Sequence, residues 1–172
     1  MNPSNEVKEG LVAAIPNLRA FAMSLCGRSA WADDLVQETL VRAWAKSDSY
    51  QDGTNLMAWL FTILRNEFYS QLRKRKREVE DIDGEVAARL TSVPDQLPNL
   101  DMQDFQAALA LLPDDQREAI VLIGASGFSY EEAAEIMGCA IGTVKSRLSR
   151  ARTRLTEILE GNELSKAPTS AA

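Results

Sequence analysis

The sequence predicts an all-α protein with two small helical domains joined by an acidic flexible linker. Apolar residues recur at helical spacing through residues 11–77. This periodicity is lost in residues 78–101, which include Gly84, Pro94 and Pro98. Residues 128–155 then show the pattern of a helix-turn-helix. We therefore expect an N-terminal domain over 1–78, a linker over 79–101, a second domain over 102–160 and a disordered tail over 161–172.

The first two helices supply core and one polar face. Residues 11–28 are largely apolar and predict a core helix that restarts at Pro16 and ends at Gly27. In residues 29–45 the apolar side chains follow helical spacing. The polar residues of this second helix fall mostly on another face and, taken alone, indicate a solvated surface: Asp33, Asp34, Gln37, Glu38 and Arg42.

A longer helix over residues 56–77 follows a polar loop at 46–55. Its predicted core stripe is Met57, Leu60, Ile63, Leu64, Phe68 and Leu72. Trp59, Phe61 and Tyr69 add aromatic surface, and residues 73–77 form the basic run RKRKR. Rings beside cations suit a strand-separated nucleic acid, in which bases stack on rings and cations hold the backbone. The alternative is that the rings are core and the basic run is a solvated helix end. For the rings alone we favour core, and for the basic run we favour nucleic acid, because a second DNA-binding element lies downstream.

The helix-turn-helix carries the most specific local signals. Short helices over 102–111 and 114–123, with Pro113 at the first position of the second, lead to it. Ser129 and Glu132 form a capping box, and Gly138 supplies a left-handed position that ends the helix. The next helix, 143–155, carries five basic residues and no acidic one.

That helix predicts binding in a DNA major groove. Its short polar side chains can reach base edges, and its cations can neutralise phosphates. The base-edge candidates are Thr143, Ser146 and Ser149, and the phosphate candidates are Lys145, Arg147, Arg150, Arg152 and Arg154. The alternative is an exposed basic helix on a small helical domain.

The charge distribution predicts that a partner is needed. The net charge of the chain is −6, although residues 65–77 and 143–155 each carry a local +5. Between them, residues 78–104 carry eight acidic residues against Arg89 alone, a local −7. Because duplex affinity depends on phosphate neutralisation, we expect the isolated chain to bind DNA poorly.

Other function classes lack their sequence signals. No apolar run reaches the ~18 residues of a membrane span, and the N-terminus does not resemble an export signal. Cys26 and Cys139 predict structural thiols in a reducing cytoplasm. With no histidine, phosphate-binding loop or catalytic constellation, we expect no metal, cofactor, small-molecule substrate or enzymatic activity.

Three stretches together carry a family resemblance. They are DDLVQETLVRAW at 33–44, NLMAWLFTILRNEFYSQLRKRKR at 55–77 and LLPDDQREAIVL at 111–122, followed by the helix-turn-helix. In this order and spacing the chain resembles an extracytoplasmic-function sigma factor of bacterial RNA polymerase over residues 10–158. It is also similar to the subgroup serving the general stress response of alphaproteobacteria.

The resemblance implies partners and residue roles. Asp33, Asp34, Gln37, Glu38 and Arg42 would bind the clamp of core RNA polymerase. The loop from Asp48 to Asn55 would capture a flipped base of the −10 element. The opened −10 strand would lie along Trp59, Arg65, Asn66, Tyr69, Arg73 and Lys74. The basic residues and serines of helix 143–155 would read the −35 duplex, and an anti-sigma factor would control the protein.

Two rival functions stay open at this point. A sigma-mimicking decoy would bind an anti-sigma factor without using promoters, but the intact basic recognition helix argues against it. A dimeric helix-turn-helix regulator would account for residues 111–155 but leave 33–77 without a role.

Overall fold

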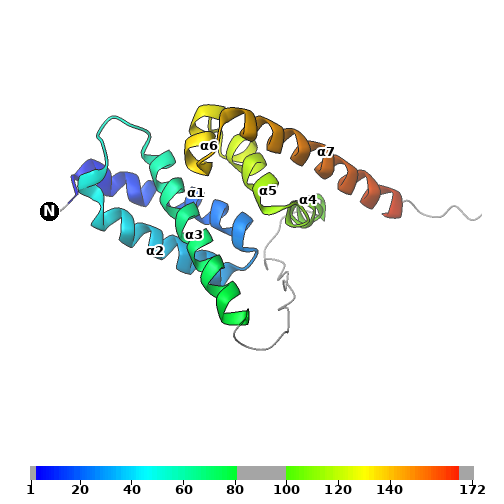
Figure 1. Ribbon diagram of the computed structural model, residues 1–172, viewed down its shortest axis with the longest axis horizontal. Coiled ribbons are helices and arrows are strands. Elements are labelled where there is room, and N and C mark those ends of the chain that lie inside the picture. The colour runs from blue at the N-terminus through cyan, green and yellow to red at the C-terminus, as the bar shows by residue number, and fades with distance from the viewer. Residues whose placement is uncertain (1–2, 81–99, 167–172) are drawn as a thin grey trace, which may run out of the picture.

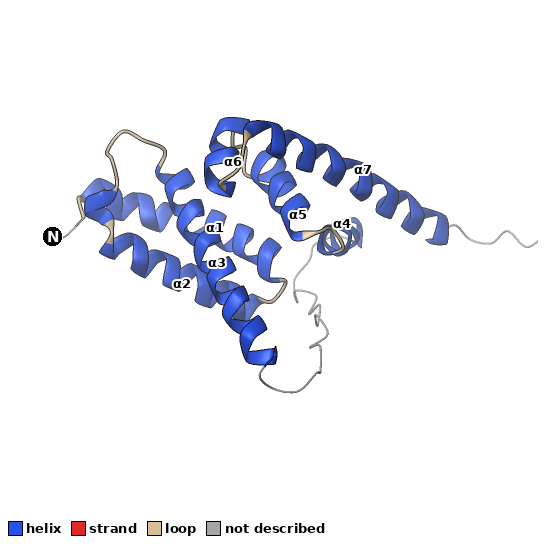
Figure 2. Ribbon diagram, in the orientation of Figure 1, coloured by secondary structure: helices blue, strands red, loops and turns tan. Residues whose placement is uncertain are grey.

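The computed structural model describes residues 3–80 and 100–166. Every regular element in these two ranges is a helix (Figure 2). The N-terminal unit comprises α1 (Asn5–Cys26), α2 (Ser29–Ala45), a 3-10 turn (Ser47–Ser49) and α3 (Leu56–Glu80). The C-terminal unit comprises α4 (Leu100–Ala110), α5 (Asp114–Ile120), a π-helical turn (Val121–Ala125), α6 (Tyr130–Met137) and α7 (Ile141–Lys166). The all-α prediction is confirmed, and most of the predicted linker lies outside the described residues.

Helix α1 has clear local signals at both ends. The Ser4 hydroxyl accepts a hydrogen bond from the Val7 amide at 3.3 Å, and Gly27 ends the helix with a left-handed φ of 66°. The expected restart at Pro16 is wrong, because one continuous helix passes through this residue. Pro16 lies on the exposed face, while the buried stripe continues on both sides of it, from Leu11 to Leu18.

The core of the N-terminal unit is aromatic and aliphatic. Phe21 of α1 stacks on Phe61 of α3, with ring centroids 4.6 Å apart, and Trp31 of α2 packs on Phe68 at 5.3 Å. Leu60 and Leu64 of α3 are fully buried in the same core. Phe61 belongs to this core, as favoured for the rings of this helix taken alone, since only 1% of the residue is exposed.

The C-terminal unit forms the predicted helix-turn-helix. The Ser129 hydroxyl accepts from the Glu132 amide, the Glu132 carboxylate accepts from the Ser129 amide, and Gly138 has a left-handed φ of 63°. Val144 and Leu148 bury the inner face of α7.

Two details of this unit differ from expectation. Pro113 is the residue that precedes α5 and not its first helical residue. Helix α7 continues through Lys166, so the expected disorder from residue 161 is wrong over 161–166, and residues 167–172 lie outside the described ranges. Gly161 does not end the helix because a glycine lowers helical stability without forbidding the conformation.

The two units pack against each other (Figure 1). Helix α6 lies along α3, and α5 contacts α1. The edge of the Phe128 ring, just before α6, meets Phe61 at a centroid distance of 5.0 Å, so the buried apolar clusters of both units form one continuous core. Within the described ranges, no helix is both long enough and apolar enough to cross a membrane.

Candidate nucleic-acid interface

The recognition helix α7 presents most of its predicted DNA contacts to solvent. Lys145, Ser146, Ser149, Arg150, Arg152 and Arg154 are exposed, and Thr143 is half-buried. The buried residues between them are apolar: Val144, Leu148, Ala151 and Leu155. One face of α7 therefore holds the helix to its unit, and the other is available for an anionic surface.

Two cations of α7 also make contacts inside the protein. The Lys145 ammonium lies over the Tyr130 ring at 5.3 Å from its centroid. Arg147 is half-buried, and its Nε lies 3.3 Å from the Asp115 carboxylate of α5. Arg147 therefore braces α7 against α5, which limits its reach toward a base edge.

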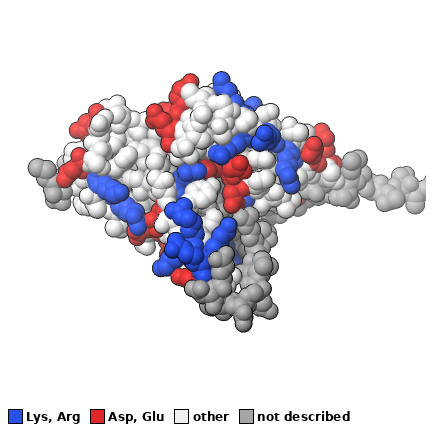
Figure 3. Space-filling view, in the orientation of Figure 1, with Lys and Arg blue, Asp and Glu red and all other residues white. Residues whose placement is uncertain are grey.

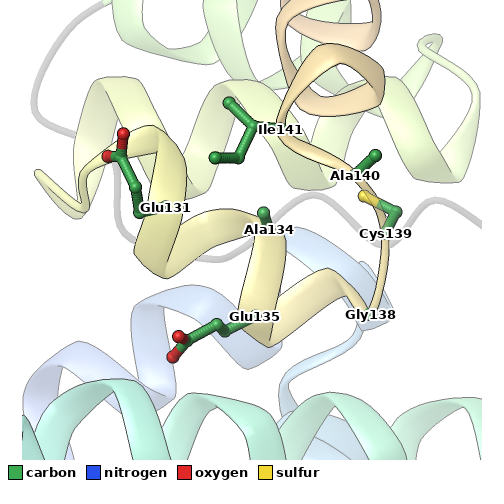
Figure 4. Close-up of a pocket in the computed structure, with 7 residues that line it drawn as sticks. All are labelled: Glu131, Ala134, Glu135, Gly138, Cys139, Ala140 and Ile141. Carbon is green, nitrogen blue, oxygen red and sulfur yellow. The ribbon is translucent and has the colours of Figure 1, made fainter.

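The turn between α6 and α7 lines a shallow groove (Figure 4). Its floor comes from Ala134, Gly138, Ala140 and Ile141, with the Cys139 thiol at the turn and Glu131 and Glu135 on the side of α6. The Arg147 guanidinium lies 3.8 Å from the Cys139 sulfur. The small residues allow the close helix crossing that a helix-turn-helix requires.

The second predicted nucleic-acid surface follows α3. Asn66, Arg73 and Lys74 are exposed, and the cations of the helix end gather in one basic patch (Figure 3). Trp59 is half-buried and packs on Tyr50 of the preceding loop at 5.2 Å. Asp48 is exposed in the same loop.

Three other predicted residues of this surface contact the C-terminal unit. Asn55 donates from Nδ2 to Glu132 at 2.7 Å, while its Oδ1 accepts from the Ala58 amide and caps α3. Arg65 pairs with Glu118 of α5, and the Tyr69 hydroxyl donates to the other Glu118 oxygen at 3.2 Å. These residues are therefore engaged within the chain.

Glu118 lies at the centre of these contacts, although the sequence pattern does not single it out. Its side chain is fully buried, and this burial raises the pKa of the carboxyl despite the opposing effect of Arg65 and Tyr69. Burial also raises the pKa of the Tyr69 hydroxyl. No local pattern marks Glu118, because its partners lie 53 and 49 residues earlier in the chain.

The predicted polymerase-binding face lies on α2. Asp33, Asp34, Gln37 and Arg42 are exposed and Glu38 is half-buried. Arg42 pairs with Glu38 at 2.7 Å and with Glu67 of α3 at 3.0 Å, and Asp33 pairs with Arg19 at 2.7 Å. Asp34 and Gln37 are thus the most accessible members, whereas Arg42 ties the face to α3.

The structure supplies no observation of catalytic or metal chemistry. Within the described ranges, no cluster of three or more histidine, cysteine, aspartate or glutamate residues could hold a metal ion. Burial raises the pKa of the Cys26 thiol to about 12, so this group is protonated at neutral pH. That state fits the structural role predicted for Cys26.

Comparisons with known proteins identify the two units. Residues 11–78 match the model of Sigma-70 region 2, and residues 102–155 match that of Sigma-70 region 4. The chain is 59% identical to the ECF RNA polymerase sigma factor EcfG of Rhodopseudomonas palustris, over 91% of this chain and 86% of that protein. The chain belongs to the extracytoplasmic-function (ECF) sigma factors.

Other ECF sigma factors support the same conclusion. SigM of Bacillus subtilis is 34% identical over 78% of this chain and 83% of its own length. The solved structure of the sigma factor RpoE from Bartonella quintana, in complex with the anti-sigma factor NepR, matches with a TM-score of 0.83. That match has 61% identity over 91% of this chain and 98% of RpoE.

Membership in this family establishes the function at family level. ECF sigma factors work with core RNA polymerase on promoter DNA, and the family is not normally enzymatic. The region 2 match includes residues 33–77, which would have no role in a stand-alone helix-turn-helix regulator.

Proposed function

We propose that this ECF sigma factor uses three separate faces during transcription initiation, and that the chain itself performs no bond chemistry. Residues 1–78 form the domain that binds core polymerase and the −10 element, and residues 102–160 form the domain that binds the −35 element. Residues 79–101 link them. The observation that carries this proposal is the exposure of α2 acids, α3 cations and α7 cations on different helices of a chain that matches both sigma regions.

The polymerase-binding face is the polar side of α2. Asp34 and Gln37 are exposed, so a basic partner surface can reach them without disturbing the core. Glu38 and Asp33 extend the same face, and Arg42 positions it through Glu67. This arrangement suits a basic helical partner such as the polymerase clamp.

The −10 face runs from the loop at Asp48 along α3. Asn55, Trp59, Asn66 and Tyr69 supply amide and ring surfaces, and Arg65, Arg73 and Lys74 supply cations for the backbone of an opened strand. A single-stranded target fits this combination better than a duplex, because rings can stack only on bases that are unpaired.

The −35 face is the outer side of α7. Lys145, Arg150, Arg152 and Arg154 are exposed along it and would hold phosphates, while Thr143, Ser146 and Ser149 lie near base edges. Arg147 contributes mainly by holding α7 on α5. Fixing both units on polymerase makes the second DNA contact intramolecular and offsets the net charge of −6.

The proposed setting is the general stress response of an alphaproteobacterium, in the cytoplasm and under an anti-sigma factor. Support comes from the 59% identity to EcfG and from the match to RpoE in its complex with NepR.

Separable variants test the three faces. Asp34→Ala with Gln37→Ala should lower core polymerase binding and leave the thermal stability of the chain unchanged. Arg150→Ala with Arg152→Ala should leave polymerase binding intact and lower promoter binding of the holoenzyme. If both pairs of substitutions reduced core binding equally, the division into separate faces would be wrong.

A further inference from the structure

The carboxylate of Glu118 joins the two units at a place where solvent is excluded. Glu118 belongs to α5, and both of its oxygens are held by α3 of the other unit. Arg65 donates from Nε to Oε1, and the Tyr69 hydroxyl donates to Oε2 at 3.2 Å. The Arg65 guanidinium also lies over the Tyr69 ring, 4.6 Å from its centroid. Arg65 and Tyr69 thus form a binding site for one anion.

Further contacts keep the C-terminal unit over this face of α3. At the start of α3, Asn55 donates to Glu132 at 2.7 Å. Further along α3, Phe61 meets Phe128. These contacts therefore engage Asn55, Arg65 and Tyr69, three of the residues that we assign to the −10 strand.

A carboxylate and a phosphate present similar oxygens to arginine. The guanidinium donates to either group with the same planar geometry, and a tyrosine hydroxyl can donate beside it. An Arg65 side chain that holds Glu118 cannot hold a strand phosphate at the same time. We propose that Glu118 occupies the place of a phosphate of the −10 strand, so that the C-terminal unit and the opened strand compete for Arg65 and Tyr69.

This inference rests on the proposed −10 role of α3. It adds that the sigma factor carries its own competitor for that face. The protein then exists in a closed arrangement, with Glu118 on Arg65, and an open one that binds the strand. Apparent affinity for the strand falls in proportion to the open fraction.

The Glu118 contact adds little net stability, so another anion can displace it. Removing a carboxylate from water opposes its attraction to Arg65, so a buried pair of this kind orients the units more than it stabilises them. A DNA strand brings several phosphates to α3, together with bases that stack on its rings. It can therefore replace one carboxylate.

A reversible lock tests the competition directly. In a chain carrying Cys26→Ala and Cys139→Ser, the substitutions Asn55→Cys and Glu132→Cys place one thiol on each unit. A short bis-methanethiosulfonate reagent then links them, and dithiothreitol releases them. The probe is a fluorescein-labelled single-stranded oligonucleotide of mixed sequence, followed by anisotropy.

We expect release of the lock to raise the affinity for this oligonucleotide about tenfold, which corresponds to about 1.4 kcal/mol of binding free energy. Chains with either single cysteine, treated in the same way, should show no change on reduction. Equal binding before and after release of the lock would overturn the proposal.

A charge-matched pair of substitutions gives a second test. Glu118→Lys places a cation against Arg65 and should open the units, while Glu157→Lys adds the same charge on the exposed side of α7. The Glu118→Lys chain should bind the oligonucleotide more tightly than the Glu157→Lys chain. When each change is combined with the cysteines at positions 55 and 132, the Glu118→Lys chain should also form the cross-link more slowly. Equal affinities and equal rates would contradict the competition.

Transcription separates this inference from the proposed function. The unmodified chain with core polymerase should transcribe from a cognate promoter. Transcription together with lock-independent strand binding would refute the competition and leave the sigma function in place. An unmodified chain that supports no transcription would refute the function itself.

Discussion

Arg147 of the recognition helix lies 3.3 Å from the carboxylate of Asp115, so a residue expected at the −35 DNA is held inside its own unit. Arg147 is half-buried, unlike Arg150 one turn later, which is exposed. Arg147 therefore holds α7 against α5, whereas Arg150 is available for DNA.

We expect Arg147→Ala to lower the free energy of unfolding by about 0.5–1 kcal/mol, the usual range for a pair of this exposure. Arg150→Ala should leave stability unchanged and weaken only promoter binding by the holoenzyme. Urea unfolding of both variants measures the difference. Identical unfolding midpoints would show that Asp115 does not brace α7.

The capping box of α6 predicts a second stability effect. Ser129→Ala removes the hydroxyl that accepts from the Glu132 amide and should cost about 1 kcal/mol. Glu132→Gln should cost less, because glutamine can also accept from the Ser129 amide. Thermal unfolding measures the stability of both variants. A larger loss of stability in Glu132→Gln than in Ser129→Ala would contradict this prediction.

The arrangement of the units should depend on pH through Glu118. Burial raises the pKa of this carboxyl, so the closed arrangement binds a proton on Glu118 more tightly than the open one does. This contribution favours closing at pH below the ordinary pKa of a glutamate and is lost as pH rises through the raised pKa of Glu118. The Ser129 amide and Asn55 lower the pKa of Glu132, whose opposite contribution acts only at lower pH.

Small-angle scattering at constant ionic strength can follow this effect. The radius of gyration should rise as the pH is raised above the ordinary pKa range of a glutamate, and measurements above the pI of 4.8 keep the chain negatively charged. Glu118→Gln should abolish the change. A pH dependence that survives in this variant would mean that another group controls closing.

Salt dependence should report the phosphate contacts of α3. Lys74 is exposed in the basic run, and losing one phosphate contact on a single strand changes the slope of log K against log salt by about 0.7. We expect Lys74→Ala to reduce the slope for holoenzyme binding to an opened −10 strand by this amount. Lys8→Ala should not, since Lys8 lies over Trp44 near the N-terminus. Equal slopes for both variants would place Lys74 away from the strand.

The sequence predicted those features whose causes are local. Ser129 and Glu132 cap α6, and Gly138 ends it, through contacts within a few residues. Apolar spacing likewise placed Leu60 and Leu64 in the core of α3. Such signals need no knowledge of the rest of the fold.

What the sequence could not predict arises where distant segments meet. Phe61 is covered by Phe21 of α1 and by Phe128, just before α6. Glu118 meets Arg65 only because α5 brings it to α3. Neither contact leaves a periodic mark in the sequence, so the spacing of α3 did not show where the second unit packs.

Promoter-specific run-off transcription by purified core polymerase, with and without this chain, tests the central claim most directly. A gel shift of the same promoter without polymerase accompanies it. We expect transcription that depends on the chain, and little shift by the chain alone, because its net charge is −6 and part of its −10 face contacts the C-terminal unit. A strong shift by the chain alone, with no transcription, would contradict it.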